Sequence, residues 1–261
     1  MRSDAVFELD GDRLVPSELA RGPWSPDAQH GGPPAALLAR AIERADPGPA
    51  PFVARLTVEF LRPVPLAPLT VQTRTVRPGR RVQWLEASLV AADVEVARAS
   101  AVRLRVDPGL ALPVPDPEAS TVPPPASGSP YVIQFPNTSV GFWQAMELRV
   151  AAGSFAEVGE ATIWFRLVVP VVADEEPTPL QRVAAAADFG NGVSAALERG
   201  RYLFINPDLT IHLHRGPVGE WVALEARTHA EANGVGLAES ALHDERGRIG
   251  RSLQSLLLDR L

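Results

Sequence analysis

The stretch that decides the fold runs LTVEFLR from residue 56 to residue 62 and returns 153 positions later as LTIHLHR, residues 209 to 215. The same offset continues without a gap to about residue 105. Ten identities in one register indicate that the chain consists of two fused copies of one unit. The repeated residues are Leu56, Thr57, Arg62, Arg74, Thr75, Val82, Glu86, Leu89, Arg98 and Leu104. A site at the seam of two such copies can be asymmetric, because only one copy needs to keep the chemistry.

Length and composition exclude several classes of protein. The 261 residues suit one large domain or two of roughly 130 residues. Cysteine is absent, which excludes disulfides, thiolate metal sites and a cysteine nucleophile. The net charge of −6 argues against a nucleic-acid partner. The N-terminus has no signal-like apolar run, and no stretch approaches the ~20 apolar residues of a membrane span, so we expect a soluble cytoplasmic protein.

A proline-rich segment, residues 110–130, divides the chain and is typical of an extended linker. It predicts an N-terminal unit over residues 1–109 and a C-terminal unit over residues 131–261. Each unit is expected to follow the order βαββββ, with one long helix wrapped by an antiparallel sheet. The predicted fold class is therefore α+β. Two such sheets can join edge to edge, which removes two sheet edges from solvent.

Proline in the first turn marks the start of both expected helices. Pro33 and Pro34 precede a helix body over residues 35–44, while Thr178 and Pro179 cap and begin a helix that continues over residues 180–188. Opening strand regions are expected at residues 6–15 in the first unit, and at 146–150 and 161–169 in the second. The later strands are expected at residues 54–60, 69–77, 82–91 and 95–106, and at residues 208–214, 221–229, 236–243 and 248–258.

The triplet His30-Gly31-Gly32 lies directly before the first helix. Two glycines let a ligand approach the backbone closely, and the free N–H groups at the positive end of a helix stabilise an oxyanion. These three residues are candidate substrate contacts. The alternative is a plain tight turn with a capping histidine.

Asp188 and Gln254 are candidate catalytic residues. Asp188 follows four alanines, and a carboxylate in such an apolar stretch is costly to bury without a partner. It is a candidate general base or water-orienting group, unless it faces solvent. Gln254 lies on the last strand, where the first unit has Ala101. If it is buried, its amide needs partners such as a ligand or water; the alternative is an exposed strand glutamine.

Other motifs carry less information. Asn206 precedes a proline and predicts a turn. Arg62 and Arg215 occupy equivalent places, which favours a structural salt link or carbonyl cap, with coenzyme phosphates as the alternative partners. His212 and His214 share a strand face, but no clear third ligand accompanies them, so we expect no metal site. The sequence contains no nucleophile elbow, P-loop or dinucleotide-binding glycine motif.

Together these segments resemble the double-hotdog acyl-CoA thioesterases of the thioesterase II type. The resemblance rests on QHGG (residues 29–32) and the following helix, FLRP (60–63), ADF (187–189), NPDLTIHLHR (206–215) and RSLQ (251–254). Their order covers nearly the whole chain outside the linker. The resemblance implies a double-hotdog fold and hydrolysis of an acyl-CoA to a fatty acid and CoA.

In that family an aspartate on the second-half helix, a small hydroxyl residue before the next strand and a glutamine on the last strand hold the hydrolytic water. These positions match Asp188, Asn206 and Gln254, which the resemblance therefore implies to be catalytic. Asn206 departs from the usual threonine, because an amide can hydrogen-bond a water but cannot relay its proton. Thr210, the nearest hydroxyl on the same strand, is a further candidate substrate contact, although its repeat at Thr57 favours a structural role.

The resemblance implies acyl-CoA, or an acyl carrier protein thioester, as substrate and no cofactor. The acyl chain is expected between helix and sheet, lined by Leu37, Leu38, Phe189 and Leu253. One rival function is a hotdog enoyl-CoA hydratase with His30 and an acidic partner as acid and base. Another is a non-catalytic acyl-CoA or lipid-binding protein, which the change at Asn206 favours. Double hotdogs often pair further, so a homo-oligomer stays an open expectation.

Overall fold

One antiparallel sheet of twelve strands forms the framework of the protein. The computed structural model describes residues 4–45, 48, 50–114, 120–135 and 140–261. The first half of the chain supplies β3 (Phe52–Phe60), β4 (Thr70–Arg77), β5 (Val82–Ala91) and β6 (Val94–Leu104). The second half supplies β7 (Ser129–Tyr131), β8 (Met146–Ala152), β9 (Ala161–Leu167), β10 (Tyr202–Ile205), β11 (Asp208–Leu213), β12 (Trp221–Ala230), β13 (Val235–Asp244) and β14 (Gly247–Arg260). The order along the sheet is β4-β5-β6-β3-β11-β14-β13-β12-β9-β8-β7, and β10 pairs with β14.

The two halves of the sheet join where β3 pairs with β11, the strands that carry the repeated sequence. Thr57 lies opposite Thr210, its own equivalent in the repeat. The local two-fold axis of the duplication therefore passes between these two residues. The later strands keep the offset of the sequence repeat, since β5 begins at Val82 and β13 at Val235. This pairing leaves β4 and β7 at the ends of the sheet.

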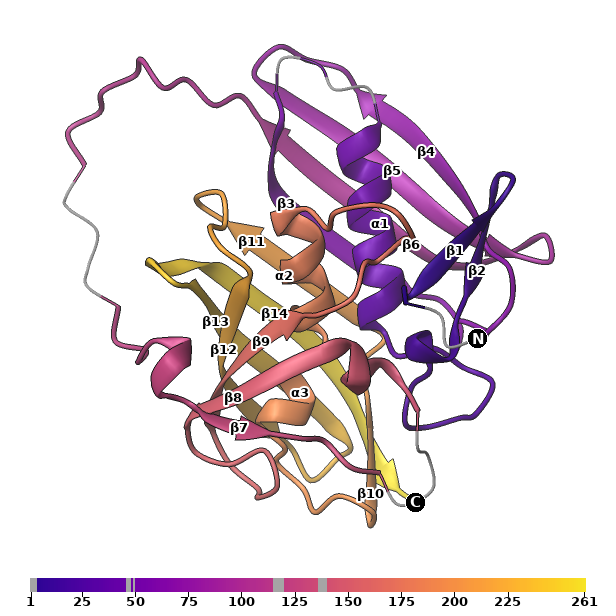
Figure 1. Ribbon diagram of the computed structural model, residues 1–261, viewed down its shortest axis with the longest axis vertical. Helices are drawn as coiled ribbons and strands as arrows, with labels where there is room; N and C mark the ends of the chain where they lie inside the picture. The colour runs from indigo at the N-terminus through magenta and orange to yellow at the C-terminus, as the bar shows by residue number, and fades with distance from the viewer. Residues whose placement is uncertain (1–3, 46–47, 49, 115–119, 136–139) are drawn as a thin grey trace.

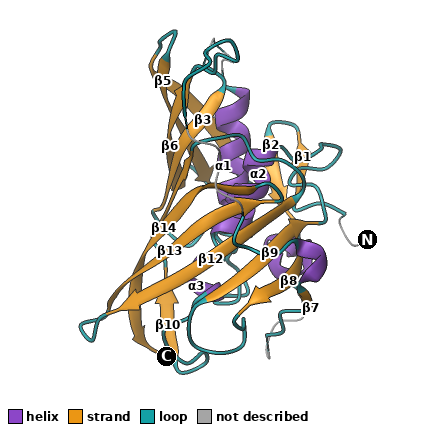
Figure 2. Cartoon of the chain, turned by 90° about the vertical axis from the view of Figure 1, so that its left-hand side faces the viewer, coloured by secondary structure: helices purple, strands orange, loops and turns teal. Residues whose placement is uncertain are grey.

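Helices α1 (Gly32–Arg44) and α2 (Pro179–Ala187) contact each other, and the strands curve around them (Figures 1 and 2). Proline fits the first turn of each helix, where its missing N–H is not needed. The Thr178 side chain caps α2 by accepting a hydrogen bond from the Gln181 N–H. Thr178 also contacts Glu43 near the end of α1. The helices thus run antiparallel, and each begins beside the end of the other.

The hydrophobic core is continuous between the two halves. Leu37, Leu38 and Ile42 of α1 are fully buried, and α1 is buried on nearly every side because it lies between the sheet and α2. Each of these side chains contributes roughly 1.5–3 kcal/mol to the free energy of folding. On β5, buried positions alternate with partly exposed ones, as expected for a strand with one face on the core.

The expected helices and the eight later strands are present, with ends within two residues of the expected positions. The expected opening strand at residues 6–15 is wrong. The chain instead forms a hairpin of β1 (Phe7–Asp10) and β2 (Arg13–Pro16), separate from the main sheet. Gly11 adopts a φ of 65° at the turn, a conformation that glycine tolerates and that reverses the chain. Strand β10 was not anticipated.

The second part of the proline-rich segment packs against the sheet. Val122 is buried, and the Trp164 indole N–H donates a hydrogen bond to the carbonyl oxygen of Pro123 at 2.8 Å. Strand β7 already begins at Ser129, inside the expected linker. Residues 115–119 of that linker lie outside the described residues. Figure 1 shows residues 110–114 as an extended connection outside the sheet.

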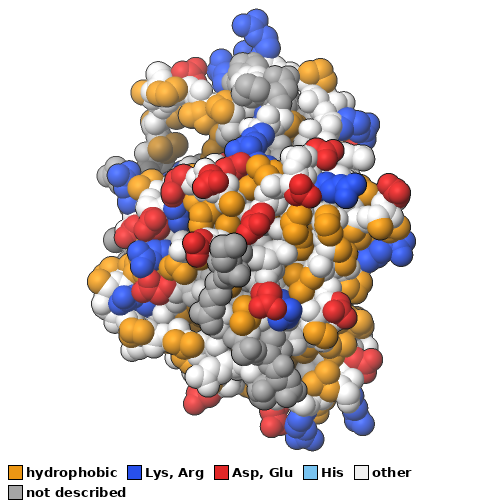
Figure 3. Space-filling view, turned by 45° about the vertical axis from the view of Figure 1, so that its right-hand side comes forward, with side chains coloured by type: hydrophobic (Ala, Val, Ile, Leu, Met, Phe, Trp, Pro, Cys, Tyr) orange, Lys and Arg blue, Asp and Glu red, His pale blue; other side chains and the backbone are white. Residues whose placement is uncertain are grey.

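Among the described residues, no helix is long and apolar enough to cross a membrane. On the face drawn in Figure 3, acidic and basic side chains are interspersed with apolar ones. Exposed cross-strand ion pairs such as Arg98–Glu59, at 2.5 Å, and Arg251–Glu239, at 2.6 Å, bring opposite charges together. Such pairs contribute little to stability, because solvent screens the two charges.

Candidate active site

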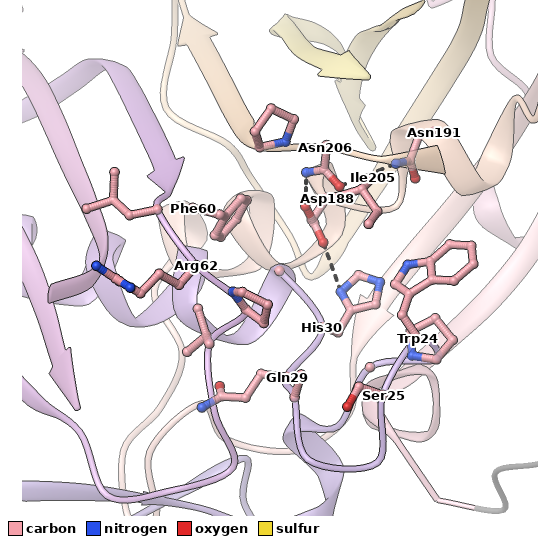
Figure 4. Close-up of a pocket in the computed structure, with 18 residues that line it drawn as sticks. Trp24, Ser25, Gln29, His30, Phe60, Arg62, Asp188, Asn191, Ile205 and Asn206 are labelled. Carbon is pink, nitrogen blue, oxygen red and sulfur yellow. Dashed lines mark hydrogen bonds and ion pairs between the residues drawn. The ribbon is translucent and has the colours of Figure 1, made fainter. Parts of the chain in front are cut away.

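The candidate site lies where the end of α2 meets the start of α1, and its centre is Asp188. This residue directly follows α2 and is only 4% exposed. Its Oδ1 accepts hydrogen bonds from Asn206 Nδ2 at 2.8 Å and from Gln254 Nε2 at 3.3 Å. Its Oδ2 lies 3.0 Å from His30 Nδ1 (Figure 4). These polar groups and the positive end of α1 compensate the cost of burying the carboxylate. The alternative of a solvent-facing Asp188 is thus excluded.

Gly31 and Gly32 are needed because other groups occupy the space where side chains would lie. A Cβ at Gly31 would lie 2.6 Å from Asp188 Oδ2. A Cβ at Gly32 would lie 2.5 Å from the Phe142 ring and 2.8 Å from the Ala185 carbonyl oxygen. The Gly32 N–H donates to His30 Nδ1 at 3.0 Å. Within the described residues, no group accepts a hydrogen bond from the Gly31 N–H.

His30 is held by its neighbours with little freedom to rotate. Its ring stacks on Phe189 with a centroid distance of 4.5 Å and lies 5.4 Å from the ring of Phe142. Only 13% of the side chain is exposed, and it lines the cavity described below. The imidazole is therefore presented to the cavity in a fixed position beside Asp188.

Gln254 is buried on β14, and protein groups already satisfy its amide. Its Nε2 donates to the main-chain oxygen of Asp188 at 3.2 Å as well as to the carboxylate. Its Oε1 accepts from the Asn191 N–H at 3.0 Å. Gly190 gives this amide room, since a Cβ there would lie 2.8 Å from Gln254 Oε1. Gln254 thus fixes Asp188, and the alternative of an exposed strand glutamine is excluded.

Asn206, between β10 and β11, binds Asp188 through its amide nitrogen, which also donates to the Asp208 main-chain oxygen at 3.2 Å. Its Oδ1 accepts from Asn191 Nδ2 at 3.3 Å. Asn191 is a site residue that the sequence analysis did not single out. Its position three residues after Asp188, about one helical turn, was the available signal.

A cavity of about 400 Å³ opens beside Asp188 and His30. Its walls come from the loop before α1, the end of β3 and the residues between β10 and β11 (Figure 4). Apolar groups dominate these walls, and the large ones are Trp24, Phe60, Leu61, Val64 and Ile205. The expected acyl-chain path is not this cavity, because its lining includes none of Leu37, Leu38, Phe189 and Leu253. Leu37 and Leu38 are instead fully packed into the core.

The equivalent arginines differ in their surroundings. Arg215 binds Asp244 through two contacts, of 2.5 and 2.6 Å, and also donates to the Gly247 carbonyl oxygen. Burial disfavours the charged form of Asp244, but the hydrogen bonds from Arg215 and from the backbone outweigh it and lower the pKa of that carboxyl. The expected salt link is thus confirmed for Arg215. Arg62 is exposed, lines the cavity and forms no ion pair within the described part of the chain.

Thr210 lies outside the cavity. Its hydroxyl donates to Thr57 Oγ1 at 3.3 Å across the junction of β11 and β3. The prediction of a substrate contact at Thr210 does not fit this position, because the hydroxyl faces its own repeat equivalent. His212 and His214 are exposed on β11 and just after it. Among the described residues, no group of three or more acidic or histidine side chains is arranged to hold a metal ion.

The sequence matches family models of known proteins, and the fold is similar to solved structures. The family model of the acyl-CoA thioesterase N-terminal domain matches residues 20–104, and that of the C-terminal domain matches residues 111–258. No curated protein matches the chain significantly. Among solved structures, a candidate thioesterase II from Thermobifida fusca is 19% identical with a TM-score of 0.72, covering 97% of this chain and 94% of that one.

Two further solved structures are similar over nearly their whole lengths. A protein of unknown function with a hotdog fold from Alicyclobacillus acidocaldarius is 20% identical with a TM-score of 0.72, covering 99% of this chain and 97% of that one. An acyl-CoA thioesterase II from Mycobacterium marinum is 15% identical with a TM-score of 0.62, covering 97% and 94%. At these identities the structural likeness establishes the hotdog fold alone.

Proposed function

Because this chain belongs to the acyl-CoA thioesterase family, we propose that it hydrolyses acyl-CoA thioesters to a free fatty acid and CoA. The observation that carries the proposal is a buried carboxylate at the wall of an open cavity. Asp188 is held in one orientation by Asn206, Gln254 and His30, and it borders a space large enough for the reacting part of a thioester. Such fixed polar groups beside an apolar cavity are typical of enzyme sites.

In the proposed reaction, a water molecule lies between Asp188 and the thioester carbonyl carbon. Asp188 orients the water and accepts a proton from it. Asn206 and Gln254 keep the carboxylate from turning, since both amides donate hydrogen bonds to it. The water oxygen attacks the carbonyl carbon as one water proton moves to Asp188. The carbon–sulfur bond then breaks, and the sulfur takes up that proton and leaves as a thiol. Positioning of this kind is worth a large factor in rate, because a misplacement of 1 Å costs about 10²-fold.

The Gly31 N–H is the proposed contact for the negative oxygen that forms on the carbonyl. It lies at the positive end of α1, and within the described residues it has no other partner. The Gly32 N–H, an equal candidate on sequence grounds, already donates to His30. One main-chain donor aimed at a developing oxyanion contributes about 10²–10³-fold in rate.

Arg62 is the proposed contact for the phosphate groups of the coenzyme. It lies on the cavity wall, and Figure 4 draws its guanidinium group turned away from Asp188. A coenzyme whose thioester reaches Asp188 would extend past the apolar side chains of Phe60 and Leu61 to this arginine. Guanidinium groups suit phosphate because they offer paired donors.

The finer architecture that we propose is a double hotdog with tandem units over residues 1–109 and 131–261. The pairing of β3 with β11 and the constant offset between later strands support two units. Each unit would wrap its strands around one helix, and the site would take His30 and Gly31 from the first unit and Asp188 from the second. Separate expression of the two segments should then give two inactive pieces, and activity should return only when they are combined.

The direct test of the activity is release of free CoA from a panel of short, medium and long acyl-CoAs, followed with a thiol reagent. The protein has no cysteine, so its own background is low. Turnover with any member supports the proposal and gives the chain-length range. Binding of acyl-CoA by calorimetry without thiol release would instead indicate a non-catalytic binding protein.

A hotdog enoyl-CoA hydratase is the second candidate function, and the 3.0 Å contact between His30 and Asp188 favours it. Hydratase chemistry uses an acid and a base on either side of a carbon–carbon double bond. A hydratase would change the ultraviolet absorbance of an enoyl-CoA without releasing thiol. Measuring both signals on the same enoyl-CoA separates the two functions.

A further inference from the structure

We propose that an exposed aliphatic strip beside the cavity binds the distal part of a long acyl chain. The strip consists of Ile205, Leu257, Val235 and Leu237, which are 39–59% exposed. This inference rests on the proposed thioesterase function and names the surface that would select long acyl groups. The size of the cavity, the register of the strands and the polar residues around the strip support it.

The cavity beside Asp188 is too small to enclose a long acyl-CoA. Its volume of about 400 Å³ lies near the lower end of the usual range for ligand sites, about 300–1,000 Å³. The space between helix and sheet offers no continuation at Leu37 and Leu38, because both side chains are fully buried in the packed core. A long chain would therefore continue along the protein surface.

The acyl chain leaves the cavity on the side of Trp24 and Ile205. The proposed coenzyme contact, Arg62, lies on the other side of Asp188 in Figure 4. Because the thioester separates the coenzyme from the acyl group, a thioester at Asp188 directs its acyl group away from Arg62. Trp24 packs edge-on against Phe204, the neighbour of Ile205 on β10, with a centroid distance of 5.3 Å. These side chains form an apolar exit from the cavity.

Ile205 connects this exit to an exposed face of the sheet. It pairs with Leu257 on β14, which in turn pairs with Val235 on β13. Directly opposed residues share a face, and Leu257 lies three residues from the buried Gln254, on the opposite face of β14. Leu237 follows Val235 by two residues and shares its face. Since neighbouring strands are ~4.8 Å apart, the row extends about 10 Å outward from the cavity wall.

The strip is narrow, which suits a hydrocarbon chain better than a protein partner. Ser255 and Asp259 flank Leu257 on the same face of β14. Stable protein interfaces bury about 800 Å² on each partner, from about 20–30 residues, and four aliphatic side chains supply a small part of that. Adjacent exposed apolar residues mark an interaction site. The continuity of this one with the cavity identifies its occupant as the acyl chain of the substrate.

The first half of the sheet carries an equivalent pair away from the cavity. Val82 pairs with Leu104, and these two residues are the repeat equivalents of Val235 and Leu257. The next partner of Leu104 is Phe52 rather than an isoleucine. The lining of the cavity, as far as the structure describes it, includes none of these three first-half residues. The pair of Val82 and Leu104 is therefore a matched control.

The test compares two double variants with polar replacements of similar shape. The strip variant combines Val235→Thr with Leu257→Asn, and the control combines Val82→Thr with Leu104→Asn. Thiol release gives KM and kcat for butanoyl-CoA and hexadecanoyl-CoA. The strip variant should raise KM for hexadecanoyl-CoA about 10-fold, the worth of roughly two buried methylene groups, and KM for butanoyl-CoA less than about twofold. The control should leave both KM values near those of the wild type, and so should Leu257→Met, which keeps an apolar side chain.

The inference is overturned if KM for hexadecanoyl-CoA does not change in the strip variant. An equal rise for both acyl-CoAs, or in both double variants, also overturns it, because the replacements then act through the fold, as thermal unfolding would show. A wild-type dimer that the strip variant converts to a monomer in sedimentation would make the strip a protein interface instead. If the wild type releases no thiol, the proposed function fails, and calorimetry with the two acyl-CoAs tests the strip separately through the same comparison of Kd values.

Discussion

Helices α1 and α2 meet at both ends, and a carboxylate lies at each end, the buried Asp188 at one and the partly buried Glu43 at the other. At one end Asp188 lies over Gly31 and borders the cavity. At the other end Glu43 accepts a hydrogen bond of 2.6 Å from Thr178, the cap of α2. There the guanidinium group of Arg103, only 1% exposed, fills the interior and donates to the Ala45 carbonyl oxygen at 2.8 Å. Burial raises the pKa of Glu43 despite its hydrogen bonds from Thr178 and Gln181.

Under the proposed function, the difference means that the duplicated scaffold keeps its reactive groups at one end of the helix pair. Both ends use the same arrangement, in which the carboxylate of one helix meets the start of the other. At the start of α1, glycine leaves the backbone open and a histidine stands beside the carboxylate. At the start of α2, the side chain of Thr178 caps the helix and also binds Glu43, so a protein side chain occupies this helix start. In the proposed mechanism, the chemistry therefore depends on the residues at the helix start as well as on the carboxylate.

Replacing each carboxylate in turn is the strongest way to break this comparison. Asp188→Asn should lower kcat for acyl-CoA about 10³-fold, within the range of general-base catalysis, because a neutral amide cannot take a proton from the hydrolytic water. Glu43→Gln should keep kcat near the wild-type value, since its end of the helix pair has no access to substrate. Thiol release with a saturating acyl-CoA measures both variants. Equal losses in the two variants would show that both carboxylates act through stability, and circular dichroism melts check that explanation.

A second comparison concerns the equivalent arginines, Arg62 and Arg215. Arg215 is clamped by Asp244 and by main-chain carbonyl oxygens, whereas Arg62 is exposed at the cavity wall. The same position in the repeat thus serves stability in one half and is left available for binding in the other. A variant that breaks the Arg215–Asp244 pair should therefore change the free energy of unfolding, whereas a variant of Arg62 should change KM for acyl-CoA.

Asp244→Asn should lower the free energy of unfolding by about 3 kcal/mol at neutral pH, the lower end of the range for breaking a buried pair, because Arg215 is 31% exposed. The pKa of Asp244 is lowered in the folded state, so its contribution is complete above the unfolded value of 3.8 and disappears as pH falls through the lower folded value. The gap between wild type and variant should then close on acidification. Urea unfolding at several pH values measures it, and a gap that is constant with pH would contradict the assignment.

Gly31→Ala should reduce kcat about 10²-fold with little change in stability, because the new Cβ would lie 2.6 Å from Asp188 Oδ2 and displace the carboxylate. Gly192→Ala is the matched control, since its Cβ would meet only the Phe155 ring at 3.8 Å, an ordinary contact. Thiol release and thermal unfolding are measured on both. Full activity in Gly31→Ala would mean that Asp188 does not need its present position.

Most helices and strands of the fold could be predicted from the sequence, because local sequence patterns determine where they begin and end. The repeat at residues 56–62 and 209–215 fixed the register of the later strands, and prolines marked the starts of both helices. The hairpin of β1 and β2 was missed because Gly11 interrupts one continuous strand-like pattern. The turn depends on a positive φ that composition alone does not show.

The sequence predicted which residues form the candidate site better than it predicted the contacts between them. Asp188, Asn206, Gln254 and His30 are all brought together, from segments far apart in the sequence. Periodicity gives no distance between such segments, so the sequence did not show that the amides of Asn206 and Gln254 donate to the Asp188 carboxylate. The contact between Thr210 and Thr57 was not visible in the sequence for the same reason, since it follows from the strand register.

The smallest expected effect sharpens the comparison of the arginines. Arg62→Gln should raise KM for acyl-CoA about 10-fold, roughly 1.4 kcal/mol, with little change in kcat or stability, because it removes one exposed charge-assisted contact. The same variant should leave KM unchanged for an acyl thioester of N-acetylcysteamine, which lacks phosphate. Added salt should raise the wild-type KM for acyl-CoA toward that of the variant, since it screens an exposed charge. An equal rise in KM for both substrates would mean that Arg62 shapes the cavity wall rather than binding the coenzyme.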